Sequence, residues 1–158
     1  MTEAEFRQRI VDEAKSWIGT PYRLGSCLKG VGVDCAQFVA AVYKAAGIMP
    51  AEDKVEIFTH DWFLHTVEER YLLRVVKYAR KMMETQVYQT TQASPGNLVL
   101  TKAAASRVYN HAGIVVAWPK IIHAVDPKVE LISACVSPLW AFQQIVILDP
   151  WKQNDREN

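Results

Sequence analysis

The chain is organised around one short stretch, Val33-Asp34-Cys35-Ala36-Gln37-Phe38. After it, apolar residues recur at helical spacing, and Gly47 closes the run where a left-handed residue commonly ends a helix. Before it, glycine and β-branched residues disfavour a helix. Asp34 is a good N-cap residue, and Gln37 three positions later completes a capping-box-like pair. The pattern predicts a helix that begins directly after Asp34.

Cys35 falls in the first turn of this predicted helix. Unpaired N–H groups and the helix dipole favour an anion there, so the pKa of the thiol is expected to drop and the reactive thiolate to form. The alternative is a small cysteine buried in the core, which is a common place for a free cysteine. The two interpretations are separated only by residues further along the chain.

Length and composition describe a single folded domain. The chain has 158 residues, of which 50% are hydrophobic and 22% are charged, and these values exclude a disordered chain. A net charge of +1 offers no electrostatic attraction for nucleic acid or an anionic membrane. No apolar run approaches the roughly 18 residues of a membrane span. We expect one domain over residues 1–151 and a polar tail over residues 152–158.

The three cysteines, Cys27, Cys35 and Cys135, are odd in number and lack the spacing of a metal site or a disulfide framework. No metal or other cofactor is therefore expected. The first residues are polar and acidic, without the basic start and apolar run of a signal peptide. The sequence predicts a protein that is made in the cytoplasm with reduced thiols.

Two further helices are expected before the strands begin. Thr2 and Glu5 form a capping box ahead of a helix that ends at Gly19. Thr59 is expected to cap a long helix that continues to about residue 82, within a helical segment of residues 50–93. The basic residues of that long helix are interpreted as a solvated face rather than as a binding patch.

The pattern changes after Gly96 to short β-branched runs separated by turn residues. These runs are residues 97–101, 111–117, 120–125, 129–133 and 144–149. Helices followed by consecutive strands indicate an α+β domain. We expect N-terminal helices packed on an antiparallel sheet of five to six strands.

Four histidines are candidate partners for Cys35. His60 and His65 lie in the expected long helix beside polar residues and are interpreted as surface residues. His111 and His123 lie on two strands of one expected hairpin. A lone histidine in an apolar strand is commonly a satisfied core residue, but two of them on one hairpin weaken that interpretation.

The length of the hairpin loop decides whether the two rings meet, because side chains alternate between the faces of a strand. With a three-residue loop at residues 117–119, Gly113 pairs with His123. His111 and His123 are then diagonal neighbours on one face. A two-residue loop places them on opposite faces, so their pairing is conditional on the longer loop.

A cysteine nucleophile needs an adjacent base that takes its proton and returns it to the leaving amine. That base needs a third group on its far nitrogen, which fixes its orientation. Cys35, His111 and His123 supply these three parts if the helix start faces the sheet. The backbone N–H groups of Cys35 and Ala36 are candidate donors to an oxyanion.

Five motifs, in this order, resemble the NlpC-type cell-wall cysteine peptidases, a family with a compact papain-like fold. They are Gly19-Thr20-Pro21-Tyr22, Asp34-Cys35, Ser94-Pro95-Gly96-Asn97-Leu98-Val99, His111-Ala112-Gly113-Ile114-Val115 and Ile122-His123-Ala124. The likeness covers about residues 14–125. It implies that Cys35 is the nucleophile, His111 the base and His123 the orienting residue.

The resemblance also implies a substrate. Members of this family cut peptidoglycan stem peptides, commonly between D-glutamate and diaminopimelate. By that likeness Tyr22 lines the site beside the cysteine, and Asp34 helps to hold the free amine of the substrate.

Three departures from the family pattern bear on specificity. Ala36 and Gln37 follow the cysteine where the family usually has serine and glycine, so a serine contact to the substrate is lost. Asn97 stands in place of the usual aspartate and is interpreted as structural. Residues 50–93 form a longer segment than in the simplest members and are expected to form a wall or lid over the cleft.

The loop at residues 29–35 is similar to that of phage-tail members of the family. Without a signal peptide, a wall hydrolase of this kind needs a virion or a secretion machine to reach its substrate. The implied partners are therefore peptidoglycan and phage-tail or secretion-system proteins, without nucleic acid or membrane.

Two other functions stay open at this point. One is a catalytically idle phage-tail or interaction protein that keeps the fold. The other is an intracellular γ-glutamyl-peptide amidase. The intact set of Cys35, His111 and His123 argues against the idle protein, and nothing in the sequence separates the wall enzyme from the amidase.

Overall fold

Three α-helices and a six-stranded sheet make up the described residues, 1–151, of the computed structural model. The helices are α1 (Glu3–Ser16), α2 (Cys35–Ala45) and α3 (Arg70–Val75). The strands of the sheet are β3 (Arg80–Gln86), β4 (Leu98–Thr101), β5 (His111–Ala117), β6 (Lys120–Val125), β7 (Lys128–Ser133) and β8 (Gln144–Asp149). Two short strands, β1 (Cys27–Leu28) and β2 (Gly32–Val33), pair separately. The expected tail of residues 152–158 lies outside the described residues.

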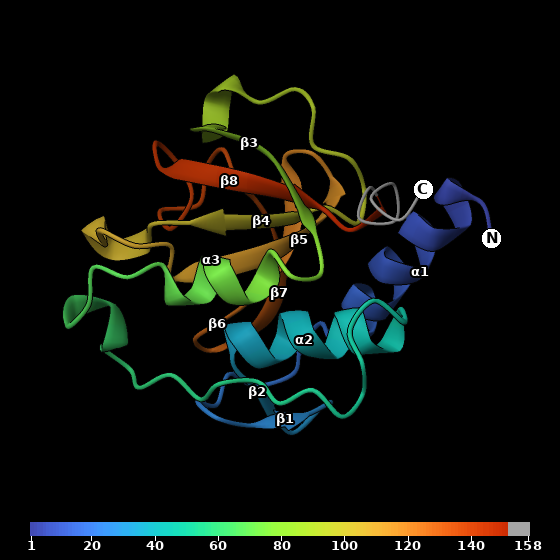
Figure 1. Ribbon diagram of the computed structural model, residues 1–158, viewed down its shortest axis with the longest axis horizontal. Coiled ribbons are helices and arrows are strands. Elements are labelled where there is room, and N and C mark those ends of the chain that lie inside the picture. The colour runs from blue at the N-terminus through green and yellow to red at the C-terminus, as the bar shows by residue number, and fades with distance from the viewer. Residues whose placement is uncertain (152–158) are drawn as a thin grey trace.

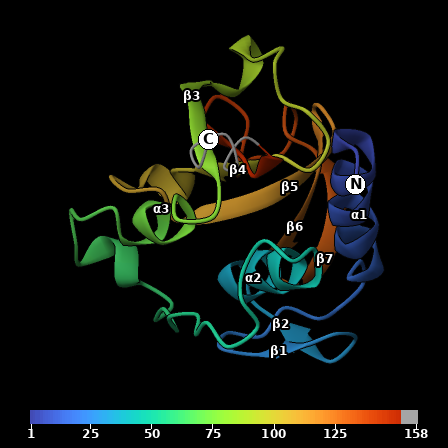
Figure 2. The same ribbon diagram turned by 45° about the vertical axis from the view of Figure 1, so that its right-hand side comes forward.

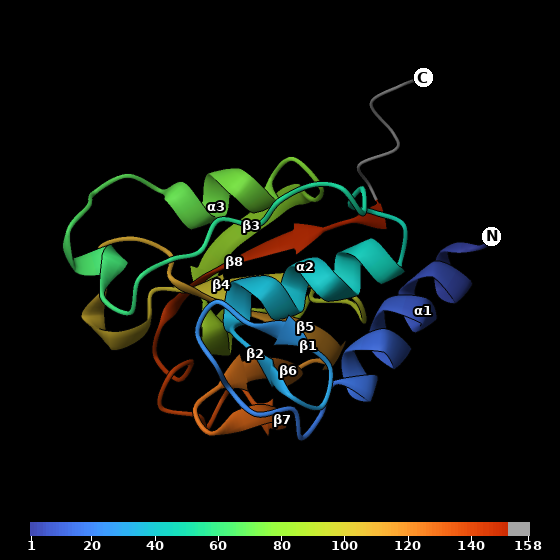
Figure 3. The same ribbon diagram turned by 90° about the horizontal axis from the view of Figure 1, so that it is seen from below.

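The sheet is antiparallel in the order β3-β8-β4-β5-β6-β7 (Figure 1). The helix α2 packs against β5 and β6, and the β1–β2 hairpin runs along α2 (Figure 3). This arrangement confirms the predicted α+β class, with N-terminal helices on an antiparallel sheet. None of the helices within the described residues is long and apolar enough to cross a membrane.

The helix α1 begins at the predicted capping box. The Thr2 hydroxyl accepts the Glu5 N–H at 3.2 Å, and the Glu5 carboxylate accepts the Thr2 N–H at 2.7 Å. The helix ends at Ser16, three positions before the predicted end at Gly19. A capping box thus defines the start of this helix more sharply than the glycine defines its end.

The helix α2 also begins where the sequence predicts. The Asp34 carboxylate accepts the Gln37 N–H at 2.9 Å, which is the half of the capping-box-like pair that the structure contains. At the other end Gly47 adopts a left-handed φ of 77°. Its N–H donates to Lys44 O, and the Ile48 N–H donates to Tyr43 O, which together form a Schellman motif. Local capping therefore fixes both ends of the helix that carries Cys35.

Apolar side chains fill two cores, one on each face of the sheet. Leu98 and Ile122 face the helices, whereas Val99 and Ile121 face the opposite core. Consecutive strand residues enter different cores because side chains alternate across a strand. The second core includes Trp140, from the connection between β7 and β8, which is fully buried.

The segment between α2 and β3 differs from the predicted long helix. It contains a 3₁₀ turn at Trp62–Leu64, the short helix α3 and then β3, so the prediction of one helix from residue 59 to 82 is wrong. The strand β3 pairs with β8, whose outer edge would otherwise be exposed. Pairing with a strand that lies far away in the sequence thus overrides the helical spacing of the apolar residues. The chain before α3 runs along the outside of the molecule (Figure 2).

The hairpin of β5 and β6 has a two-residue turn, Trp118-Pro119, rather than the three-residue loop that a shared face for the histidines requires in a regular ladder. Ala117 pairs with Lys120, and a β-bulge at Val116 then shifts the register by one residue. Ile114 therefore pairs with Ile122. The bulge supplies the residue that the turn lacks, so the two histidines share a face although the three-residue loop set as the condition for it is absent.

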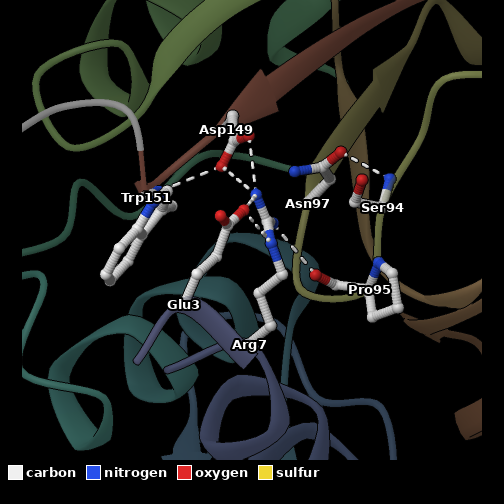
Figure 4. Close-up of polar contacts among 7 residues, drawn as sticks. All are labelled: Glu3, Arg7, Ser94, Pro95, Asn97, Asp149 and Trp151. Atoms are coloured by element: carbon white, nitrogen blue, oxygen red, sulfur yellow. Dashed lines mark hydrogen bonds and ion pairs between the residues drawn. The ribbon is translucent and has the colours of Figure 1, made fainter. Parts of the chain in front are cut away.

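A buried polar cluster ties α1 to the sheet (Figure 4). The Arg7 guanidinium forms an ion pair of 2.8 Å with Asp149 and also donates to Pro95 O. The Asn97 side-chain oxygen accepts the Ser94 N–H at 2.7 Å, and its amide nitrogen is buried and points toward Arg7 and Asp149. This position fits the structural interpretation of Asn97. We call Arg7, Asn97 and Asp149 the α1 cluster.

Candidate active site

One cavity of about 260 Å³ brings together most of the residues that the sequence singled out. Cys35, His111, Tyr22 and Asp34 all line it. They come from the start of α2, the start of β5 and the loop before β1, which are far apart in the sequence. His123 lies behind the cavity wall with 1% of its surface exposed. The roles of these residues remain predictions, but the structure places four of them around one space.

Cys35 is the first residue of α2, and its own N–H and that of Ala36 face its sulfur. Burial, together with the neighbouring Asp34 carboxylate, raises the pKa of Cys35 to about 12. The two N–H groups and the Tyr71 hydroxyl act in the opposite direction but do not outweigh burial. The expected lowering of the pKa is therefore wrong for the free protein, in which Cys35 is a neutral thiol at neutral pH.

His111 occupies the first position of β5 and is 7% exposed. Its Nε2 lies 2.9 Å from Nδ1 of His123. Burial lowers the pKa of His111 to about 3, with a smaller contribution from His123, so the ring is neutral at neutral pH. Cys35 and His111 both line the cavity, but within residues 1–151 no hydrogen bond joins their side chains directly. Such bonds often shorten only when a substrate is present.

Two residues that the sequence analysis missed complete the surroundings of His123. The His123 Nε2 lies 3.2 Å from the Glu130 carboxylate, and Trp140 Nε1 donates to His123 Nδ1 at 3.1 Å. Glu130 is directly opposite His123 in the β6–β7 register, so counting along that hairpin would have found it. No local pattern marks Trp140, which reaches the histidines from a connection between strands. We call His111, His123, Glu130 and Trp140 the histidine cluster.

Tyr71 is a third residue that the sequence did not single out. It lies on α3, is 3% exposed and directs its hydroxyl at the Cys35 thiol. The hydroxyl is buried without a hydrogen-bond partner of ordinary geometry. A buried donor without a partner is costly, and such groups concentrate at functional sites. The length of residues 50–93 predicted a wall or lid over the cleft, but not which ring would reach the cysteine.

Asp34 is held more tightly than the resemblance implies. Its Oδ1 accepts the Gln37 N–H and its Oδ2 accepts the Gly25 N–H at 2.7 Å, and the residue is 4% exposed. Asp126, in the turn after β6, is exposed and lines the same cavity. Burial and the nearby Cys35, Asp34 and Asp126 raise the pKa of Tyr22 to about 12. Tyr22 is thus a protonated donor beside two carboxylates.

The outer wall of the cavity comes from the segment before α3. Phe58, Trp62 and Phe63 line it, as does His60, which lies in a loop rather than in a helix. The surface interpretation fits His65, which is exposed and contacts Asp61 at 2.9 Å. Within the described residues no group of three His, Cys, Asp or Glu side chains is placed to hold a metal ion.

A model of the NlpC/P60 family matches residues 19–148 of the chain. The match spans the loop that carries Tyr22, the helix α2 and the sheet up to Leu148 of β8. The chain therefore belongs to the NlpC/P60 family, as its motifs predict. The similarity of residues 29–35 to phage-tail members stays a prediction.

A curated relative supports the same assignment. The Murein DD-endopeptidase MepS/Murein LD-carboxypeptidase of Escherichia coli (strain K12) is 26% identical over 136 residues. The aligned part is 86% of this chain and 58% of the relative. The chain thus spans a little more than half of the length of this relative.

Two solved structures from Mycobacterium tuberculosis share the fold. The peptidoglycan hydrolase RipB superposes with a TM-score of 0.60 at 15% identity, over 95% of this chain and 68% of RipB. RipD, described as a non-catalytic NlpC/p60 domain protein adapted to peptidoglycan binding, gives 0.51 at 12% identity, over 89% of this chain and 95% of RipD. These likenesses show the papain-like NlpC/P60 fold, which occurs in both a hydrolase and a non-catalytic protein.

Proposed function

We propose that the protein hydrolyses an amide bond in peptidoglycan stem peptides, with Cys35 as nucleophile and His111 as base. The observation that carries the proposal is that Cys35 and His111 line the same cavity, with Nε2 of His111 2.9 Å from Nδ1 of His123. Family membership and the murein endopeptidase relative support the substrate class. The intact pair of cysteine and histidine favours catalysis over a non-catalytic role.

The reaction begins from a neutral pair, because burial raises the pKa of Cys35 and lowers that of His111. As the sulfur attacks the substrate carbonyl carbon, the thiol proton passes to the ring nitrogen of His111 that does not contact His123. The carbonyl oxygen becomes an oxyanion. The N–H groups of Cys35 and Ala36 are the proposed donors to it, and the Tyr71 hydroxyl, directed at the same sulfur, is a further donor.

The second half of the reaction returns the protein to its starting state. The His111 imidazolium gives its proton to the leaving amine, the C–N bond breaks and a thioester remains on Cys35. His111 then takes a proton from water, and the resulting hydroxide attacks the thioester carbon. The thiolate leaves and recovers the proton from His111.

The acidic end of the cavity is the proposed site for the free amine of the stem peptide. Both Asp34 oxygens already accept backbone N–H groups, so Asp34 adds its charge at a distance. The exposed Asp126 is the carboxylate with room to contact an ammonium group. Asp34→Asn is an unsuitable probe, because an amide cannot accept both N–H groups. Asp126→Asn removes the charge and leaves the N-terminus of α2 intact.

The bond that we propose is the γ-D-glutamyl–diaminopimelate bond, which the family resemblance favours. The name of the E. coli relative refers to D,D and L,D bonds, so the test must include all three. Muropeptides with free N-terminal amines are incubated with the purified protein, and products are identified by mass spectrometry. We expect the γ-D-glutamyl bond to be cut by the wild type and by Cys135→Ala, and by no Cys35→Ala preparation.

Controls separate the alternatives. Cys135 is an exposed free cysteine, so Cys135→Ala controls for the loss of a thiol. His123→Ala should retain a rate above that of Cys35→Ala, since an orienting residue transfers no proton. Cleavage at another bond corrects the specificity but keeps the mechanism. Binding of muropeptides without any cleavage contradicts the proposal and favours a role like that described for RipD.

A further inference from the structure

A single nitrogen of His123 receives two polar contacts. His111 Nε2 lies 2.9 Å, and Trp140 Nε1 3.1 Å, from His123 Nδ1. The indole N–H of tryptophan can only donate a hydrogen bond. The Nδ1 of His123 must therefore present a lone pair and carry no proton.

The directions of the other bonds follow from that one. A neutral His123 without a proton on Nδ1 carries its proton on Nε2, which donates to Glu130 at 3.2 Å. His111 Nε2 must in turn donate to His123 Nδ1, because two lone pairs would repel each other at 2.9 Å. A neutral His111 has only one ring proton, so its Nδ1 is left unprotonated.

We propose that Trp140 is a positioning residue whose indole N–H sets the direction of the hydrogen-bond chain from His111 through His123 to Glu130. It thereby keeps His111 Nδ1 free to take the proton of Cys35. Only this last step rests on the proposed function. The direction of the chain belongs to the resting protein, whether or not it cuts a peptide.

Glu130 alone does not explain the neutral state of His123. Burial lowers the pKa of His123, whereas the Glu130 carboxylate raises it. Among the described residues, the titratable groups in contact with His123 are His111 on β5 and Glu130 on β7. A doubly protonated His123 would direct an N–H at the indole N–H and would reverse the bond to His111. Trp140 opposes that state, which Glu130 favours.

The sheet has room for the indole at this place. The Trp140 ring lies 5.5 Å from the His111 ring and 6.2 Å from the His123 ring, measured between centroids. A Cβ atom on Gly113 would lie 3.3 Å from Trp140 Cζ2 and 3.2 Å from the Ile122 carbonyl oxygen. Such contacts are tight, so a side chain on Gly113 would press on the indole. The glycine thus leaves space for the tryptophan beside both histidines.

Long-range ¹H–¹⁵N correlation in labelled protein reads which ring nitrogen of each histidine is protonated. The chain has four histidines, so His60→Gln and His65→Gln variants suffice to separate the exposed pair from the buried pair. In the wild type at neutral pH we expect the proton on Nε2 of both His111 and His123. A proton on Nδ1 of either ring overturns the proposal. Failure to cut muropeptides leaves this result untouched, so the two proposals fail separately.

Trp140→Phe keeps an aromatic ring and removes the donor. We expect His123 to take up its second proton about one pH unit higher than in the wild type, and His111 to shift its proton to Nδ1 below that pH. At neutral pH we expect the kcat of Trp140→Phe to be about tenfold lower than that of the wild type, with KM little changed. A titration identical to that of the wild type overturns the proposal.

Two matched variants complete the experiment. Trp17→Phe removes another largely buried indole N–H, which bonds to Glu13 at 3.0 Å, and should leave the histidine signals unchanged. Glu130→Gln keeps an acceptor without the charge, and in the Trp140→Phe background it should cancel the upward shift. If it does not, Glu130 is not what Trp140 opposes and the proposal is wrong. The wild-type measurement decides the direction of the chain even if Trp140→Phe fails to fold.

Discussion

The α1 cluster and the histidine cluster bury polar side chains at opposite ends of β4. Asn97 directly precedes that strand, and His111 pairs with Thr101 at its far end. In the α1 cluster two full charges meet, the Arg7 guanidinium and the Asp149 carboxylate, 2.8 Å apart. In the histidine cluster two rings meet, and burial lowers the pKa of both.

The difference lies in what desolvation does in each place. In the α1 cluster the attraction between opposite charges offsets the cost of removing them from water, and the gain is a fixed docking of α1. In the histidine cluster the same cost is what keeps the rings neutral, so that one lone pair stays available for a proton. Burial of polar groups thus holds a helix in place at one end of the sheet and, in the proposed mechanism, serves chemistry at the other.

The largest expected effect separates the two clusters by activity. His111→Gln should lower kcat/KM on muropeptides by about 10⁴-fold or more, because glutamine cannot take a proton from the thiol. Its melting temperature should stay near that of the wild type. The control is His65→Gln, at an exposed position away from the pair, which should be fully active. A His111→Gln variant that keeps a tenth of the wild-type rate contradicts the assignment of the base.

Arg7→Met should show the converse pattern. It leaves the Asp149 carboxylate buried without its partner, which typically costs about 3–5 kcal/mol of unfolding free energy. Urea unfolding measures the loss, and the rate per folded molecule should be unchanged. Arg9→Met, an exposed arginine on the same helix, should be near neutral. Equal stability of the two variants would show that the α1 cluster does not hold the helix in place.

Acid should weaken the fold through the histidine cluster. The pKa of His111 is about 3 in the folded protein and about 6.5 when unfolded, so the unfolded state binds the proton first as pH falls. The free energy of unfolding does not depend on this ring above pH 6.5. Between pH 6.5 and pH 3 it declines as the pH falls, by up to about 1.4 kcal/mol per pH unit. Denaturant unfolding between those values should show a shallower decline for His111→Gln. Parallel curves for variant and wild type would refute the lowered pKa.

The smallest expected effect concerns two buried tyrosine hydroxyls, those of Tyr71 and Tyr43, which have no hydrogen-bond partner of ordinary geometry among the described residues. Tyr71→Phe removes one of the groups that lower the pKa of Cys35, so alkylation of Cys35 should need a higher pH and kcat should fall about tenfold. Tyr43 lies on α2. Burial raises the pKa of its hydroxyl, and the charged groups that act on that pKa are Asp149 and Arg7 rather than Cys35. Tyr43→Phe should change neither quantity. Equal alkylation profiles for both variants would remove Tyr71 from the site.

Much of the fold could be predicted because its signals are local. The capping box of Thr2 and Glu5, the Asp34 cap and Gly47 act within a few residues and define α1 and α2. The five β-branched runs after Gly96 all form strands. The missed strand, β3, is stabilised by pairing with β8, about sixty residues further along the chain. Helical spacing of apolar residues cannot report such a partner.

The candidate site divides along the same line. The motifs named Cys35, His111, Tyr22 and Asp34, which the structure places around one cavity. Burial depends on the whole fold, so the raised pKa of Cys35 had no signal in the sequence, where only the helix start was visible. Trp140 comes from a connection between strands, and nothing near it in the sequence reveals its contact with His123.

The bulge at Val116 determines how the register of the β5–β6 hairpin responds to deletion of a residue. Without the bulge, the two-residue turn would pair Val116 with Ile121 and would send one ring to the opposite face. Loss of Val116 removes the extra residue itself, so a regular ladder would still pair Val115 with Ile121. A hairpin shortened by deletion of Val116 therefore keeps both histidines on one face. It offers a single register, whereas the longer hairpin offers two, of which one assembles the site.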